Sequence, residues 1–340
     1  MSALRIVDLY KRAAHRSAVR AKVASYAGHY GGAAGVEDRK NGYAGMTNDF
    51  YDLVTDFYEI GWGESFHFAP MARGESFEAS IARHEHYLAH RLRLEPGMSA
   101  LDVGCGVGGP MRSIARFSGA RVVGINNNAY QIELARAYNE DAGLSQRCDF
   151  VHGDFMKMPV APETFDAAYA VEATCHAPDK AGCFAEVFRV LRPGARFAGY
   201  EWCLTPSWDA TNPEHVAICQ GIEQGNSLPA LASTDEVVRA LEAAGFEVLD
   251  HRDVALDSDP ETPWYTPLSG DGLSLRTMAQ SPVGRWLTER TVTVLESVGL
   301  APEGTKRVSA LLNDAAMHLV NGGRTGCFTP MYFFCARKPG

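Results

Sequence analysis

Residues 101–110, LDVGCGVGGP, are the stretch of sequence that decides the fold we expect. The apolar residues before the glycines predict a short strand, and Pro110 is well placed in the first turn of a following helix. Gly104, Gly106 and Gly109 match the spacing G-x-G-x-x-G, which is a weak signal by itself. Glycines here let a ligand approach the backbone, and a helix N-terminus offers free N–H groups to an anionic group.

Short apolar strands alternate with helices on the C-terminal side of this motif. The expected strands are 99–103, 121–125, 148–154, 165–171 and 195–202, each followed by a helix, loop or longer excursion. A further helix and strand are expected within 234–255, and a last strand is expected at 329–338. This alternation predicts an α/β fold with a Rossmann-like doubly wound sheet that ends in an antiparallel strand.

The remaining segments predict an N-terminal helical lid and a C-terminal helical subdomain. Residues 3–26 carry six Lys or Arg against the single acid Asp8, near helical spacing. This basic helix could bind an anionic lipid surface, or it could simply pack on its parent domain. We expect a basic helix and linker at 1–45, with the Gly-rich 28–45 as the linker, a lid or substrate segment at 46–95, the ligand-binding core at 96–258, the helical subdomain at 259–326, and the final strand and tail at 327–340.

Composition excludes several classes of protein. The 340 residues carry 32 Lys and Arg against 41 Asp and Glu, a net charge of −9, so nucleic acid is not an expected partner. No apolar run reaches the length of about 18 residues that a bilayer span needs, and no secretory signal follows the basic start. The eight cysteines form no C-x-x-C pair, which indicates reduced thiols. We expect a cytoplasmic protein that is soluble or peripheral to a membrane.

Polar residues at the ends of the first three strands point to the ligand. Asp102 suits the positive amino-acid end of a ligand, whereas a dinucleotide-binding protein would have an acid where Asn126 and Asn127 stand. Their amide oxygens can still accept from ribose hydroxyls. Asp154 can accept from an adenine amino group, and Phe155 can pack against the ring. S-Adenosyl-L-methionine is a ligand with all these parts. For each residue alone, a purely structural role is an equal alternative.

At this point the chain resembles the sterol C-24 methyltransferases, from about Asn48 to Lys338. The segments that carry the resemblance are YDLVTDFYEIGWGESFHFAP, ESFEASIARHEHYLA, LDVGCGVGGP, IARFSGARVVGINNNAYQI, GDFMKMP, EATCHAPDKAG, YEWCLT, PWYTPLSG, GLAPEGTKRV and FTPMYFF. EQGNSLPAL departs from the more acidic string that is usual in the family, which bears on substrate preference.

The resemblance implies methylation of a sterol side-chain double bond, with S-adenosyl-L-homocysteine as the spent donor. The alkene attacks the sulfonium methyl, a cation forms at the neighbouring carbon, a hydride migrates, and a proton leaves. This chemistry requires reactants aligned in a closed apolar pocket, aromatic faces and negative potential for the cation, and a base. The family likeness implicates Tyr58 and Glu59 in catalysis.

The remaining candidates follow from these three requirements. The possible bases are His67, Glu172, His176 and Glu201, among which the residues do not decide. The expected substrate contacts are Tyr58, Trp62, Phe66, His67, Trp264 and Tyr265. The candidate cofactor contacts, besides Asp102, Asn126, Asn127, Asp154 and Phe155, are Tyr51, Ser65, Gly104, Cys105, Gly106, Gln131 and Glu172.

Three alternatives stay open. His84, Glu85 and His86 resemble a metal motif, but an i, i+2 pair on a helix points in different directions, so we expect no metal. The acceptor could instead be another terpenoid or a tocopherol-like phenol. A non-catalytic lipid-binding protein with a vestigial nucleotide fold is a third possibility. Residues alone leave the preferred sterol, the number of methyl additions and homo-oligomerisation open.

Overall fold

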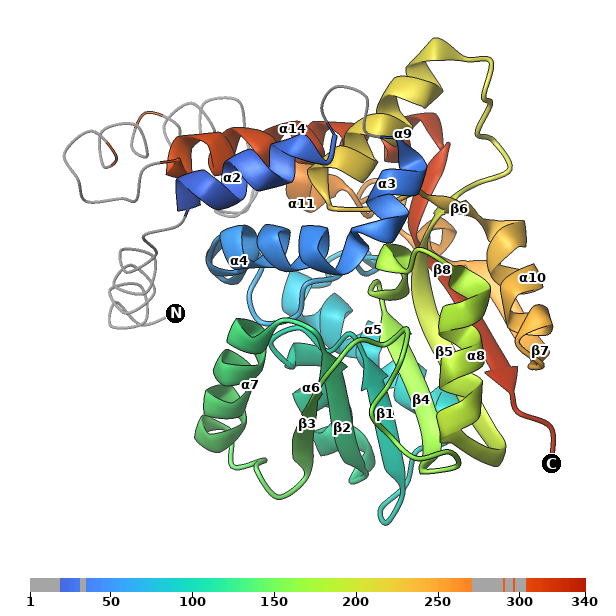
Figure 1. Cartoon of the computed structure of the whole chain (residues 1–340). Helices are drawn as coiled ribbons and strands as arrows, with labels where there is room; N and C mark the ends of the chain where they lie inside the picture. Colours follow the sequence, from blue (N-terminus) through green and yellow to red (C-terminus); the bar gives the residue numbers. More distant parts are fainter. Residues whose placement is uncertain (1–18, 31–34, 271–289, 291–295, 297–303) are drawn as a thin grey trace. The chain divides into compact units, whose positions relative to one another are not determined.

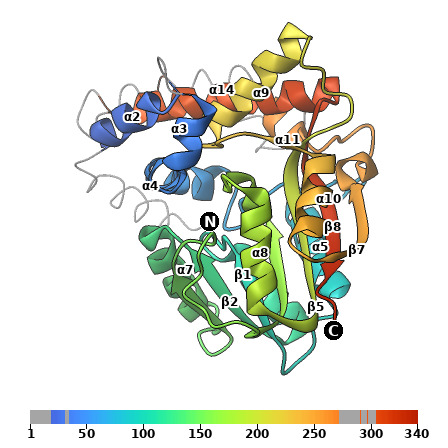
Figure 2. The same ribbon diagram turned by 45° about the vertical axis from the view of Figure 1, so that its right-hand side comes forward.

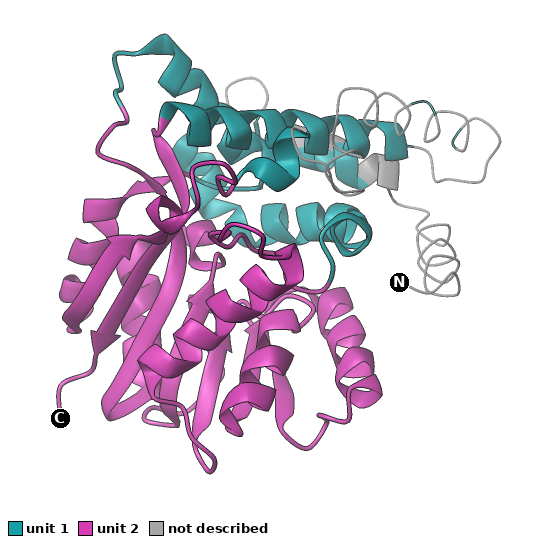
Figure 3. Ribbon diagram, turned by 180° about the vertical axis from the view of Figure 1, so that it is seen from behind, with its two compact units in different colours: residues 1–63, 209–229, 265–325 teal, residues 64–208, 230–264, 326–340 magenta. Residues whose placement is uncertain are grey.

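The computed structural model describes residues 19–30, 35–270, 290, 296 and 304–340. The chain divides into two compact units, each built from segments that are distant in the sequence (Figure 3). The helical unit takes residues 1–63, 209–229 and 265–325, and the sheet unit takes residues 64–208, 230–264 and 326–340. The predicted lid segment is therefore divided, because its first helix belongs to the helical unit and its second to the sheet unit.

One sheet forms the centre of the sheet unit (Figure 1). Its strands are β1 Ser99–Val103, β2 Arg121–Asn126, β3 Cys148–His152, β4 Phe165–Val171, β5 Leu191–Leu204, β6 Ala232–Ser233, β7 Glu247–Asp253 and β8 Phe328–Arg337. The spatial order is β3-β2-β1-β4-β5-β8-β7, with β6 beside β5. Strands β1 to β6 pair in parallel, whereas β8 is antiparallel to β5 and β7. The predicted doubly wound α/β sheet and its antiparallel final strand are confirmed.

Helices cover both faces of this sheet (Figure 2). They are α5 Phe77–Leu92, α6 Gly109–Ser118, α7 Ala129–Asp141, α8 Lys180–Val190 and α10 Thr234–Ala243. Neighbouring residues of β8 point to opposite faces, as a strand requires. The ring of Phe333 lies 5.3 Å from that of Tyr87 on α5, and the ring of Phe334 lies 5.7 Å from that of Phe184 on α8. Burial on both faces explains the continuous apolar run of this strand.

The helical unit has its own core. Its helices are α2 Val19–Gly28, α3 Val36–Asn41, α4 Tyr43–Gly61, α9 Pro213–Gly225, α11 Thr266–Ser269 and α14 Thr305–Thr325. Met46, Phe50 and Val54 recur at intervals of four on α4 and form the buried face of that helix. They pack with Tyr26 of α2 and Val308 of α14. No helix among the described residues is long and apolar enough to cross a bilayer.

The prediction of a linker at 28–45 is wrong for residues 36–45, which form α3 and the start of α4. A six-residue helix is too short to show a periodic apolar face, so tertiary contacts hold it instead. Arg39 of α3 pairs with Glu223 of α9 at 3.2 Å. Residues 1–18 of the predicted basic helix and most of the predicted helix at 284–298 lie outside the described residues. Within α2, Tyr26 is buried in the core of the unit.

Candidate functional site

The glycine turn between β1 and α6 is shaped by close backbone contacts. Gly104 has a φ of +78°, and a Cβ on it would lie 2.5 Å from the Cβ of Ala173, so only glycine fits. The thiol of Cys105 is turned toward β2, because a Cβ on Gly124 would lie 2.5 Å from its Sγ. Burial raises the pKa of this thiol well above its ordinary value. The side chain of Cys105 therefore packs beneath the turn, and its backbone contributes to the turn itself.

Asp102, the next-to-last residue of β1, is a buried carboxylate beside this turn. It is 2% exposed, and among the described residues its hydrogen-bond donor is the hydroxyl of Tyr169, at 3.0 Å. Burial raises the pKa of Asp102 to about 7, although the Tyr169 bond opposes this. A carboxylate that is buried beside a neutral hydroxyl is stabilised by a cationic ligand. The environment of Asp102 thus fits the ammonium group that the sequence predicts for it.

The Asn-rich end of β2 brings two predicted cofactor contacts together. The side-chain amide of Asn126 donates to Oε1 of Gln131 at 2.8 Å. Asn128 has a structural role, because its Oδ1 caps α7 by accepting from the backbone N–H of Gln131 at 2.9 Å. The backbone carbonyl of Asn127 lies 3.0 Å from Nε2 of His152. Asn126 and Gln131 therefore form one polar pair at the carboxyl end of the sheet.

Asp154 and Phe155 follow β3 in a short turn. Oδ1 of Asp154 accepts from the backbone N–H of Met156 at 2.8 Å, which is a local turn contact. Phe155 is partly buried and packs against the main apolar core of the sheet unit. Both residues thus have the structural roles that the sequence left open beside the ligand roles, so their contacts with a cofactor stay a prediction.

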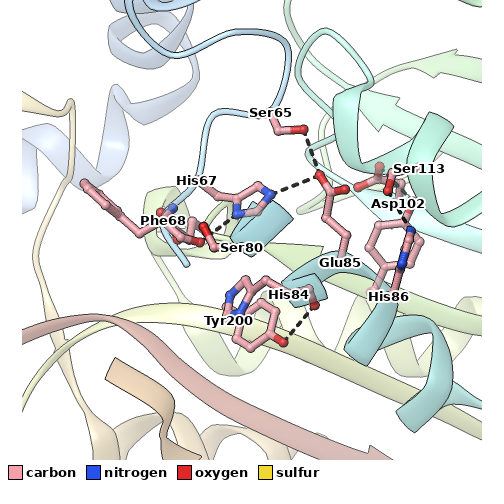
Figure 4. A network of polar contacts seen from close by, with 12 residues as sticks. Ser65, His67, Phe68, Ser80, His84, Glu85, His86, Asp102, Ser113 and Tyr200 are labelled. Carbon is pink, nitrogen blue, oxygen red and sulfur yellow. Dashed lines mark hydrogen bonds and ion pairs between the residues drawn. The ribbon is translucent and has the colours of Figure 1, made fainter. Parts of the chain in front are cut away.

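Residues 64–68 run across the start of α6 (Figure 4). A Cβ on Gly109 would lie 2.1 Å from the backbone oxygen of Glu64, so the third glycine of the motif makes room for this segment. Arg112 of α6 pairs with the Glu64 carboxylate at 2.9 Å. Ser65 donates its hydroxyl to Oε1 of Glu85 on α5 at 2.7 Å. The segment is thus held from two helices beside the glycine turn.

Glu172 follows β4 and is held by two N–H donors. Its Oε1 accepts from the backbone N–H of Phe68, and its Oε2 accepts from the indole N–H of Trp202, both at 2.7 Å. Its φ of +53° is unusual for a residue other than glycine. Burial raises the pKa of Glu172 to about 8, while positive His67 and the two hydrogen bonds act in the opposite direction. The chain thus buries a titratable carboxyl group at the ligand-binding edge of the sheet.

Four aromatic rings surround the region of Glu172. The ring of Phe68 lies 4.9 Å from that of Trp264 and 6.2 Å from that of Trp202, and Phe328 contacts both tryptophans. We call Phe68, Trp202, Trp264 and Phe328 the aromatic cluster. Trp264 was predicted as a substrate contact, whereas Trp202 and Phe328 were missed. An aromatic residue directly after Glu201, at the carboxyl end of a central strand, was the available signal for Trp202.

His67 contacts both the 64–68 segment and α5. Its Nδ1 lies 2.7 Å from the backbone oxygen of Phe68, and its Nε2 lies 3.1 Å from Oε1 of Glu85 (Figure 4). Burial lowers the pKa of His67, but Glu85 and Glu172 outweigh it and raise the pKa above 6.5. Sequence reasoning missed Glu85. Its signal was a charged residue within the buried periodic face that Ile81 and Leu88 define.

The three residues of the metal-like motif face different partners, as their helical spacing predicts. His84 stacks on Tyr200 with ring centroids 3.4 Å apart, Glu85 contacts His67, and His86 stacks on Phe117. Among the residues that the structure describes, no group of three His, Cys, Asp or Glu side chains is arranged to hold a metal ion.

Glu201 and His176 lie near the ends of β5 and β4. Glu201 is fully buried; its Oε2 accepts from the hydroxyl of Thr174 and lies 3.4 Å from Nζ of Lys180. Its Oε1 accepts from the backbone N–H of Trp202 at 3.2 Å. These bonds give Glu201 a structural role in joining β5 to the loop after β4. His176 is buried at the end of the short helix Thr174–His176.

Five predicted site residues belong to the helical unit, and their place in the site stays a prediction. They are Tyr51, Tyr58, Glu59 and Trp62, on α4 or at its end, and Tyr265, before α11. Tyr51 and Tyr58 pack against the core of that unit, and burial raises the pKa of Tyr58 well above 10. Phe66 is half-buried within the 64–68 segment of the sheet unit.

Similar structures and a family model identify the class of protein. A methyltransferase domain model matches residues 101–199. The mycolic acid cyclopropane synthase CmaA1 complexed with SAH and CTAB is 17% identical, with a TM-score of 0.68 over 87% of this chain and 98% of that one. The [4+2]-cyclase SpnF is 23% identical, with a TM-score of 0.64 over 87% of this chain and 97% of that one. The fold and the site define a class I methyltransferase.

Curated relatives cover nearly the whole chain and narrow this class to one family. Cycloartenol-C-24-methyltransferase 1 of Oryza sativa subsp. japonica is 54% identical over 92% of this chain and 90% of its own length, and sterol 24-C-methyltransferase ERG6 of Saccharomyces cerevisiae is 51% identical over 89% and 81%. The chain belongs to the sterol 24-C-methyltransferase family. A model described as sterol methyltransferase C-terminal also matches residues 275–340.

Proposed function

We propose that this chain transfers a methyl group from S-adenosyl-L-methionine to the side-chain double bond at C-24 of a sterol. The observation that carries the proposal is the buried Glu172 carboxylate, fixed by two N–H donors beside the aromatic cluster. Aromatic faces and a carboxylate together suit a carbocation that must lose a proton in a water-poor site.

The methyl donor supplies an electrophilic methyl group on a cationic sulfur. The residues that would hold it lie at the ends of β1, β2 and β3. Asp102 would accept from its ammonium group, the pair of Asn126 and Gln131 would bind its ribose, and Asp154 would accept from its adenine. The buried carboxylate of Asp102 fits this cationic group because the protein itself gives it a neutral partner, Tyr169.

Glu172 is the proposed base. With a pKa of about 8 in the ligand-free protein, its carboxylate holds a proton firmly once it has taken one, and a cation nearby favours its ionised form. Each carboxylate oxygen has two lone pairs, so the bonds from Phe68 and Trp202 leave room for the incoming proton. The faces of Trp202 and Trp264 would stabilise the positive charge before the proton leaves.

The test is product analysis with methyl-labelled donor. We expect a sterol with a side-chain double bond to gain the label and keep an alkene, detected by mass spectrometry. Glu172→Gln should lower turnover by about 100-fold or more while S-adenosylhomocysteine still binds. Glu140→Gln, the same substitution on the exposed face of α7, is the control and should be fully active.

Two outcomes would overturn the proposal. Label on a terpenoid or a tocopherol-like phenol, with none on sterols, would assign another acceptor. A folded chain without affinity for S-adenosylhomocysteine in calorimetry would indicate the non-catalytic, lipid-binding alternative.

Membrane contact through residues 3–26 is a further part of the proposal, motivated by the basic charge of this segment. Deleting the segment would remove Tyr26 from the core of the helical unit, so charge reversal is the cleaner test. Arg12→Glu with Arg16→Glu should reduce flotation with anionic liposomes and leave binding to neutral liposomes unchanged. Equal flotation of both forms would remove this segment from consideration as a membrane contact.

A further inference from the structure

The two ring nitrogens of His67 each face a hydrogen-bond acceptor. Nδ1 lies 2.7 Å from the backbone oxygen of Phe68, which can only accept, so this nitrogen must carry a proton. Nε2 lies 3.1 Å from Oε1 of Glu85, which accepts whenever the carboxylate is ionised. Both side chains are fully enclosed, with 1% and 2% of their surface exposed, so water does not replace these partners.

The surroundings of Glu85 favour its ionised form. The hydroxyl of Ser65 donates to Oε1 at 2.7 Å, the same oxygen that faces His67. Burial acts to raise the pKa of Glu85, but the hydrogen bond and charge of His67 outweigh it and lower the pKa. With Glu85 ionised, Nε2 of His67 must carry a proton as well, and a histidine protonated on both nitrogens is a cation.

We propose that Glu85 is a positioning residue that keeps His67 as an imidazolium, so that His67 anchors the 64–68 segment and does not remove the proton from the product cation. This proposal deepens the proposed function and rests on it for the assignment of the base. Among the candidate bases, it removes His67, which has no lone pair to accept a proton while both nitrogens are protonated.

Every titratable group that faces His67 is consistent with a cation at this point. Glu85 faces it from α5, Glu172 from the end of β4, and Asp102 from β1, and all three are carboxyl groups. The fourth neighbour, His84, stacks on the ring of His67 with centroids 5.6 Å apart. Burial lowers the pKa of His84 well below 6.5, so it stays neutral and adds no positive charge. One imidazolium thus lies among three carboxyl groups.

The imidazolium also has a geometric consequence for Glu172. His67 fixes the carbonyl of Phe68, while the N–H of the same residue donates to Oε1 of Glu172 at 2.7 Å. The backbone of Phe68 is therefore held on both sides, by a charge-assisted hydrogen bond and by the carboxylate that it serves. Glu85 acts on Glu172 through His67 and Phe68, which is why it positions the base without touching the substrate.

The direct test is nuclear magnetic resonance of the full chain labelled with ¹⁵N-histidine, without donor or sterol. The His67 signals are assigned by their loss in His67→Gln. We expect both ring nitrogens of His67 to be protonated at about pH 7.5, well above the ordinary histidine range. In Glu85→Gln the titration midpoint should fall by more than about one pH unit, because an adjacent opposite charge is lost.

A matched control is available on the same helix. Glu78→Gln removes the same charge from an exposed position in the first turn of α5 and should leave the His67 midpoint unchanged. A neutral His67 in the wild-type chain at about pH 7, with the shared proton on Glu85, would overturn the proposal. The wild-type spectrum decides this even if Glu85→Gln does not fold. An equal midpoint in wild type and folded Glu85→Gln would overturn it as well.

A kinetic measurement separates this proposal from the proposed function. In both Glu85→Gln and His67→Gln, the rise of turnover with pH that reports Glu172 should persist and move to higher pH, because Glu172 loses a neighbouring cation. If that rise disappears in His67→Gln, His67 is the base and the proposal fails. A cationic His67 in a chain that methylates no sterol would refute only the proposed function, since the spectra do not depend on activity.

Discussion

Trp202 donates its indole N–H to the carboxylate of Glu172, with Nε1 and Oε2 2.7 Å apart inside the aromatic cluster. Trp202→Phe keeps an aromatic face but removes this donor. Losing a hydrogen bond to the ionised form raises the pKa of Glu172 further above 8. We expect turnover near neutral pH to fall by about tenfold or more, since a hydrogen bond to a charged group contributes roughly 1.5–3 kcal/mol. The pH dependence of turnover measures this.

Trp208→Phe is the matched control for this substitution. The indole nitrogen of Trp208 is buried and has no hydrogen-bond partner among the described residues, so its loss removes no donor from a carboxylate. An equal effect of the two substitutions would show that ring size, and not the bond to Glu172, matters.

Asp102→Asn should weaken binding of S-adenosylhomocysteine, which retains the ammonium group, by more than about tenfold at pH 8. Because the pKa of Asp102 is about 7, the wild-type chain should also bind more weakly at about pH 6 than at about pH 8, by up to about tenfold. The variant should lose this pH dependence. Isothermal titration calorimetry checks both, with Asp149→Asn on the exposed side of β3 as control. A pH dependence that survives in Asp102→Asn would contradict the assignment.

The stability of the ligand-free chain should fall as pH rises from about 5 to about 8. The pKa values of Asp102 and Glu172 are raised to about 7 and about 8 from 3.8 and 4.5, so the folded chain holds protons that the unfolded chain has released. Their stabilising contribution is full below the unfolded pKa and is lost as pH rises through the folded pKa. Each group adds a slope of at most about 1.4 kcal/mol per pH unit. Urea unfolding should show a shallower decline in Asp102→Asn.

Gly109→Ala should destabilise the sheet unit by about 1–3 kcal/mol, because the new Cβ would lie 2.1 Å from the backbone oxygen of Glu64 and the 64–68 segment would have to move. Chemical denaturation measures the loss. Gly45→Ala is the control, since nothing lies within 4 Å of its added Cβ in α4. Equal stability of both variants would show that the segment yields without cost.

Tyr58 is best tested with two substitutions. Tyr58→Ala should depress turnover while donor binding stays intact, but it also opens a cavity beside Phe50, whose ring lies 6.4 Å away. Such a cavity costs about 3–5 kcal/mol. Tyr58→Phe keeps the packing and the aromatic face and should retain most of the turnover, if the ring face stabilises the cation. Calorimetry with S-adenosylhomocysteine and steady-state kinetics separate the two effects. A fully active Tyr58→Ala would remove Tyr58 from the catalytic residues.

Local pattern was sufficient for the sheet and for the ligand-binding edge. Strands β1 to β5 and β8 were predictable because each is a short apolar run bounded by glycine, proline or polar residues. Asp102 and Glu172 were predictable because residues after parallel strands meet at one edge of the sheet. Helix α3 was not predictable, because six residues show no periodic face and Arg39 is held by Glu223 of a distant segment.

The sequence by itself determined the fold class, the family and which carboxyl groups gather at the end of the sheet, since strand order and motif spacing are local properties of the chain. Only the tertiary structure decided what those groups do. The protonation of His67 depends on Glu85, which comes from a helix 18 residues further along, and the environment of Glu172 depends on Phe68 and Trp202. Burial and hydrogen-bond partners set the charge of a group, and these arise from contacts between distant segments that no local pattern contains.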